Sequence, residues 1–160
     1  MKHVKAVVVL FIFLFYLKSN AQNLEYGNVS KEELLEKVHP IDSTAAAAII
    51  FKKAKTYFVY ERGNGFYLYH DFKIRFKVYK TKGLKWADFS VIYLNKREGF
   101  EEEIVKFSNC ITYNLENGEI IVTPLRNEGN LKTNLNKYWN QTLITMPNVK
   151  AISSLINKIG

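Results

Sequence analysis

A strand, a tight turn and a returning strand between residues 104 and 124 constrain the fold of this chain more than any other feature. The turn holds Asn117-Gly118, and both residue types tolerate the positive φ that a two-residue hairpin connection requires. Pro124 closes the returning strand. The pattern predicts a β-hairpin, so we expect a β-rich domain.

The first strand of this hairpin alternates between apolar and polar side chains, as a half-buried strand does. One of its faces carries Val105, Phe107, Ile111, Tyr113 and Leu115. We expect this face to point into the core. Asn109 interrupts the face and would need a hydrogen-bond partner if it were buried.

Residues 66–79 form the longest run of regular alternation. Apolar side chains fall mainly on one face, and charged or tyrosine side chains fall on the other. The length predicts a half-buried antiparallel strand that is bent or bulged. On the polar face, Lys73, Arg75 and Lys77 are a candidate surface for an anionic glycan or another polyanion. The same stripe is typical of an ordinary solvent face, where charges discourage edge-to-edge aggregation.

The remaining segments predict more strands and a short helix. Ser30 and Glu33 form a capping box and Pro40 prevents extension, so we expect a helix of about two turns. Apolar residues at helical spacing in the tail predict a second short helix. Together the patterns predict a mainly β, antiparallel β-sandwich-like domain with a short N-terminal helix. The further strands are expected at 45–51, 56–61, 86–94, 135–139 and 142–146, with a polar turn at 52–55. The apolar residues of the helix expected in the tail are Ile152, Leu155, Ile156 and Ile159.

The first 21 residues have the three parts of a secretory signal peptide. A basic start precedes an apolar run over residues 6–17, and Ser19-Asn20-Ala21 offers small residues for cleavage. The apolar run is well short of the roughly 20 residues of a spanning helix. We therefore expect no transmembrane anchor after cleavage of residues 1–21, and a single β-rich domain over residues 22–160 in the periplasm, the cell envelope or the extracellular space.

The charge of the exported chain is moderately basic. Cleavage removes Lys2, Lys5 and Lys18 and no acidic residue, so the formal net charge falls from +8 to +5. This balance does not predict nucleic-acid binding in an exported protein. It favours anionic glycans or lipid head groups as partners, with plain solubility as the simpler explanation.

Cys110 is the single cysteine, so the chain cannot form an internal disulfide. We expect an ordinary strand residue here; the alternative is a nucleophile assisted by His39 or His70. His70 and Asp71 are adjacent in a strand and point to opposite faces, so they do not form a direct dyad. These residues provide no zinc ligand set, and no cofactor is expected.

Glu101-Glu102-Glu103 is the remaining cluster of potential chemistry. Neighbouring carboxylates serve in acid–base catalysis or in calcium binding. Consecutive glutamates in a charged loop are more often solvated, which is the interpretation that we favour.

A series of segments then resembles a known family in content and order. These segments are 29–34, 39–42, 47–51, 72–78, 83–87, 112–118, 138–139 and 145–150. The chain resembles the "domain of unknown function 3857" family of exported Bacteroidetes proteins, in which this domain precedes a transglutaminase-like domain. The resemblance implies a β-sandwich-like domain with no catalytic role, because the family's Cys, His and Asp lie in the following domain. None of those roles passes to Cys110, His39 or His70.

The tail departs from the family, which has an acidic-glycine turn and a further strand after the segment that matches 147–150. We therefore expect a domain that is incomplete at its C-terminal end, from a truncated or frame-shifted gene. The expected function is that of a non-catalytic binding or scaffolding module, with an envelope protein or a glycan as partner. The alternatives are a glycan- or polyanion-binding sandwich and a stand-alone hydrolase or transferase that uses Cys110.

Overall fold

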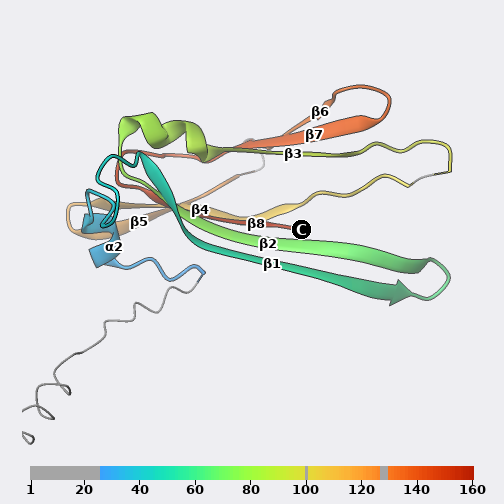
Figure 1. Ribbon diagram of the computed structural model, residues 1–160, viewed down its shortest axis with the longest axis horizontal. Helices are drawn as coiled ribbons and strands as arrows, with labels where there is room; N and C mark the ends of the chain where they lie inside the picture. Colours follow the sequence, from blue (N-terminus) through green and yellow to red (C-terminus); the bar gives the residue numbers. More distant parts are fainter. Residues whose placement is uncertain (1–25, 100, 127–129) are drawn as a thin grey trace, which may run out of the picture.

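The computed structural model describes residues 26–99, 101–126 and 130–160, which form two antiparallel sheets and two short helices. The larger sheet has five strands in the order β1-β2-β8-β4-β5, and the smaller has the order β3-β7-β6 (Figure 1). The prediction of a mainly β, sandwich-like domain is confirmed. The strands are β1 (Ala47–Glu61), β2 (Gly65–Val78), β3 (Asp88–Leu94), β4 (Phe107–Glu116), β5 (Glu119–Pro124), β6 (Asn130–Asn134), β7 (Trp139–Thr145) and β8 (Ser154–Ile159), and the helices are α2 (Lys31–Leu35) and the 3-10 helix η1 (Thr81–Ala87).

The core lies between the two sheets. Phe76 and Val78 of β2 and Leu155 of β8 meet Ile144 of β7 there. The ring of Phe76 also packs against that of Phe89 on β3, with 5.2 Å between centroids. Because side chains alternate along a strand, the neighbouring residues of β2 point to the opposite, outer face of the larger sheet.

The predicted hairpin is present as β4 and β5. Glu116 pairs with Glu119, and the two turn residues Asn117 and Gly118 have φ values of 50° and 78°. Both values lie in the left-handed region that this turn requires. The local sequence was sufficient to specify this connection.

The expected core face of β4 is wrong beyond Asn109. This residue has a φ of 49° at a register shift between Ser108 and Ile111, so the strand contains a β-bulge. The additional residue reverses the alternation, and the fully buried face carries Cys110, Thr112 and Asn114. Ile111, Tyr113 and Leu115 are only half-buried.

The helix predicted in the tail is also wrong, because these residues form β8 at the centre of the larger sheet. β8 pairs with β2 on one side and β4 on the other. Leu155 and Ile156 are both buried although they point to opposite faces. A strand that is covered on both faces loses the alternation that distinguishes it from a helix.

Two other predictions concern β1 and α2. Residues 52–55 continue β1, so the turn expected there is wrong and the strand runs unbroken to Glu61. The predicted helix start is confirmed, since Ser30 Oγ accepts a hydrogen bond from Glu33 N at 3.1 Å. α2 lies on the outer side of the larger sheet, away from β3, β6 and β7 (Figure 1).

Candidate functional site

The basic side chains predicted to form a solvent face are covered in the structure. Arg75 and Lys77 have no exposed surface and Lys73 is half-buried. Arg75 Nη1 donates to the main-chain oxygen of Asn28 at 2.6 Å, and Nη2 lies 3.5 Å from Glu33 Oε2. The N-terminal segment and α2 therefore cover this part of the sheet. The expectation of an exposed basic stripe is wrong for Arg75 and Lys77.

Lys77 lies in the same buried ionic group. Burial lowers its pKa, while the carboxylates of Glu36 and Glu33 act in the opposite direction. Its ammonium also lies 5.3 Å from the centre of the Tyr79 ring, whose hydroxyl donates to Glu36 Oε1 at 3.0 Å. The nearby carboxylates offset part of the cost of burying this ammonium, although Lys77 Nζ has no hydrogen-bond partner among the described residues. The arrangement attaches α2 to the sheet.

Cys110 is poorly suited to act as a nucleophile. The thiol is buried and donates weakly to Ser108 O at 3.6 Å. Burial raises the pKa of Cys110 to about 11, which disfavours the reactive thiolate.

The two histidines have partners of their own. His70 Nδ1 is hydrogen-bonded to Thr56 Oγ1 at 2.9 Å on an exposed strand pair. His39 Nδ1 accepts from the main-chain N–H groups of Ile41 and Asp42, and its ring meets Tyr79 edge-on. The contacts given for His39 and His70 are therefore with neighbouring residues and not with Cys110.

The three consecutive glutamates contact three different groups. Glu101 Oε2 lies 3.4 Å from Lys96 Nζ, and Glu102 Oε1 accepts from Asn140 Nδ2 at 3.1 Å. Glu103 Oε2 accepts from Leu94 N at 2.7 Å. The carboxylates of Glu102 and Glu103 therefore hold this loop to β7 and β3. Across residues 26–99, 101–126 and 130–160, no group of three or more His, Cys, Asp or Glu side chains is placed to hold a metal ion.

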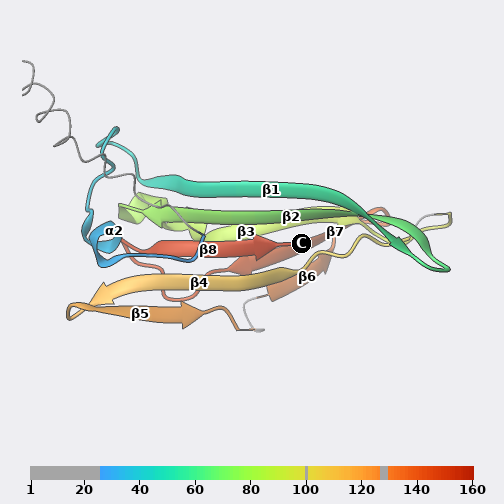
Figure 2. The same cartoon turned by 90° about the horizontal axis from the view of Figure 1, so that it is seen from below.

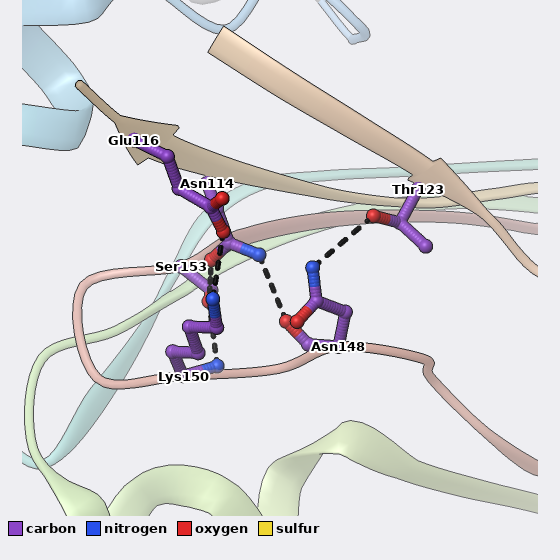
Figure 3. Close-up of polar contacts among 6 residues, drawn as sticks. All are labelled: Asn114, Glu116, Thr123, Asn148, Lys150 and Ser153. Carbon is purple, nitrogen blue, oxygen red and sulfur yellow. Dashed lines mark hydrogen bonds and ion pairs between the residues drawn. The ribbon is translucent and has the colours of Figure 1, made fainter. Parts of the chain in front are cut away.

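Residues 112–118 and 145–150 lie together in space (Figure 3). Asn114 Nδ2 donates to the main-chain oxygen of Asn148 at 2.8 Å, and Lys150 Nζ binds Glu116 Oε1 at 2.7 Å. The Ser153 hydroxyl donates to Asn114 Oδ1. These contacts fix the connection between β7 and β8 against β4, so we assign them a structural role.

The most distinctive surface is the outer end of the β1–β2 hairpin. β2 pairs with β8 only from Phe72 to Lys77, so residues 55–71 pair solely across the hairpin within the described chain. We call residues 55–71 the arm. Figure 2 shows it projecting to one end of the molecule, beyond β8 and β4.

One face of the arm presents large apolar side chains to solvent. They come from two adjacent cross-strand pairs, Phe58 with Leu68 and Tyr60 with Phe66. The exposed fractions are 70% for Phe58, 49% for Leu68, 61% for Tyr60 and 75% for Phe66. These side chains lie on the same strand face as Phe76, which is buried against the smaller sheet.

The opposite face of the arm is also aromatic. Tyr57 and Tyr69 stack with 5.5 Å between ring centroids and 13° between planes. Lys55 Nζ lies 4.5 Å from the centre of the Tyr57 ring. Such cross-strand pairs stabilise a hairpin that lacks further strands.

Sequence reasoning found the arm's composition but missed its exposure. Alternation correctly placed Phe66 and Leu68 on the same face as Phe76. Alternation along a strand does not tell where the smaller sheet ends. The position of that end decides which of these residues are buried.

Comparisons of the chain with models of protein families, with curated proteins and with solved structures give no match. Within the described residues, no helix has the length and apolar character needed to cross a membrane.

Proposed function

We propose that this chain is an exported, non-catalytic β-domain that acts as a binding or scaffolding module of the cell envelope. The observation that carries the proposal is the arm's exposed apolar face. Contiguous exposed apolar side chains on a soluble domain mark surfaces of interaction. The resemblance to a domain that precedes a transglutaminase-like domain supports the same role.

The two alternatives have less support. A polyanion would need access to Lys73, Arg75 and Lys77, and two of these have no exposed surface. An enzyme that uses Cys110 would need a thiolate, and burial works against one.

Export is tested by producing the full chain in a Gram-negative bacterium and measuring the mass of the product in the periplasm. The expected product begins at Gln22. Retention of residues 1–21 in a chain that stays in the cytoplasm would contradict export.

Binding is tested by comparing envelope retention of arm variants. The unaltered chain is expected to remain with washed cell envelopes, whereas Phe58→Ser with Phe66→Ser is expected to be released. Ile41→Ser with Leu131→Ser is the matched control, because both residues are exposed and lie outside the arm. Equal retention of all three proteins would contradict a role for the arm.

A further inference from the structure

We propose that the arm binds the surface of an anionic lipid bilayer. This inference rests on the proposed binding function and names its partner. Three features of the arm carry it: its apolar side chains, the exposed cations on the arm and at its base, and its position in the fold.

The apolar side chains form one continuous group. In an antiparallel pair, directly opposed residues share a face, so Phe58 and Leu68 lie beside Tyr60 and Phe66. The rings of Tyr60 and Phe66 are in contact, with 5.1 Å between centroids. The group lies next to the turn that ends the hairpin.

The chemistry of this group favours lipid over glycan. Phe58, Phe66 and Leu68 have no side-chain hydrogen-bonding group, so they offer nothing to sugar hydroxyls. They suit the boundary between head groups and acyl chains, into which apolar faces of surface-bound segments insert by about 5–10 Å. Tyr60 has an apolar ring and a polar end, which is the character of residues enriched at that boundary.

Four exposed cations lie on the arm or at its base. Lys55 and Arg62 lie on the arm, Lys52 and Lys53 lie at its base, and all four are exposed. The two acidic residues of the arm, Glu61 and Asp71, are half-buried, and Asp71 Oδ2 accepts a hydrogen bond from Tyr57 Oη at 3.3 Å. Alternation puts Lys52 on the apolar face and Lys53 and Lys55 on the other. Because β1 is an edge strand, Lys52 and Lys53 are able to extend past the edge toward lipid phosphates, whereas Lys55 Nζ lies over the Tyr57 ring on the opposite face.

The loop between β3 and β4 projects toward the same end of the molecule (Figure 2). It carries charges of both signs, with Lys96, Arg97 and Lys106 beside Glu98 and Glu101–Glu103. Glu101 lies near Lys96, and Glu102 and Glu103 are hydrogen-bonded to Asn140 and Leu94. We therefore expect any preference for anionic lipid to come from the cations of the arm and its base.

The test uses the processed chain purified from the periplasm and sedimentation with lipid vesicles. One set of vesicles contains phosphatidylcholine alone, and the other also contains phosphatidylglycerol. We expect binding to the anionic vesicles and weak binding to the neutral ones. Raising the salt to about 0.5 M should weaken binding, because it screens the exposed cations.

Variants assign the binding to the arm. Phe58→Ser with Phe66→Ser should reduce binding to anionic vesicles about tenfold or more, since both inserting rings are lost. Neutralising Lys52, Lys53 and Lys55 with glutamine should remove the preference for anionic over neutral vesicles. The control Ile41→Ser with Leu131→Ser should bind as the unaltered chain does. Matching thermal melts establish that each variant is folded.

Three results would overturn the inference: no sedimentation with anionic vesicles, equal binding by the arm variant, or binding that the control variant also loses. An arm-dependent dimer without vesicle binding would assign the face to a second copy of the chain. Arm-dependent retention on an anionic glycan without vesicle binding would assign it to glycans. If the chain does not bind vesicles but its retention on cell envelopes still requires the arm, the lipid inference is wrong and the proposed function stands.

Discussion

Arg75 and Glu33 form an ion pair beneath α2, with 3.5 Å between Nη2 and Oε2 and with side chains that are 0% and 12% exposed. The pair joins a residue of the larger sheet to a helix that lies about forty positions earlier in the chain. Glu33 Oε1 also accepts a hydrogen bond from Ser154 Oγ at 2.7 Å, so one carboxylate binds both β2 and β8.

Replacing Glu33 should therefore destabilise the fold. Glu33→Gln is expected to lower the free energy of unfolding by about 3 kcal/mol, because it removes negative charge that compensates buried cations. Glu32→Gln is the matched control in the same helical turn, since Glu32 is exposed. Urea unfolding measures both variants, and an equal loss in the two would contradict the role of this ion pair.

Gly83 in η1 should not tolerate a side chain. A Cβ atom at this position would overlap the main-chain oxygen of Ala46, which accepts hydrogen bonds from the N–H groups of Tyr79 and Lys80. Gly83→Ala is expected to cost about 3 kcal/mol of stability, because the backbone must shift to relieve the overlap.

The control for this prediction is Gly63→Ala in the arm turn. Gly63 has a φ of 91°, but no heavy atom lies within 4 Å of the place that a Cβ atom would occupy. The free energy of unfolding of this variant should fall by only about 1 kcal/mol, which is the cost of placing alanine at a positive φ. A Gly83→Ala protein as stable as Gly63→Ala would show that the contact with Ala46 is easily relieved.

Thr112 and Thr142 allow a buried hydroxyl without a hydrogen-bond partner to be compared with one that has a partner. Neither residue has exposed surface. The hydroxyl of Thr142 donates to Tyr93 Oη at 3.4 Å, whereas that of Thr112 has no hydrogen-bond partner among the described residues. Thr112→Val should raise the stability by about 1 kcal/mol, since it removes an unsatisfied hydroxyl while keeping the shape. Thr142→Val should give no such gain, and a loss in both variants would contradict the prediction.

Stability should fall in alkaline solution partly through Cys110. Its pKa is raised from 9.0 to about 11 in the folded chain, so the folded state binds the thiol proton more tightly than the unfolded state does. The thiol's contribution is therefore fully present below about pH 9 and is lost as the pH rises toward about 11.

Cys110→Ala should reduce this dependence. Urea unfolding at a series of pH values between about 8 and 11 should show a shallower decline for the variant than for the unaltered chain. Partly buried tyrosines, including Tyr26 with a pKa raised to about 12, contribute to the remaining decline in both proteins. Identical slopes would mean that Cys110 does not titrate in this range.

The local features of this fold were readable from short stretches of sequence. Asn117-Gly118 specified a hairpin turn, Ser30 specified the start of α2, and the run from Phe66 specified a long strand. Each of these outcomes depends on backbone preferences that act over a few residues.

Two features of the larger sheet were harder to predict: the bulge in β4 and the burial of β8 on both faces. The bulge at Asn109 exchanged the two faces of β4 and put Cys110 and Thr112 into the core. The spacing of Leu155 and Ile156 favoured a helix, since a strand that is buried on both faces shows no alternation.

The sequence by itself determined that this chain forms antiparallel strands, because alternation and turn chemistry are local properties. Only the tertiary structure decided which faces meet water. Arg75 and Lys77 are buried because α2 and the N-terminal segment cover them, while Phe58 and Phe66 are exposed because no strand among the described residues packs on this face of the arm. Burial depends on segments that are distant in the sequence, and no local pattern encodes which of them will lie against a given face.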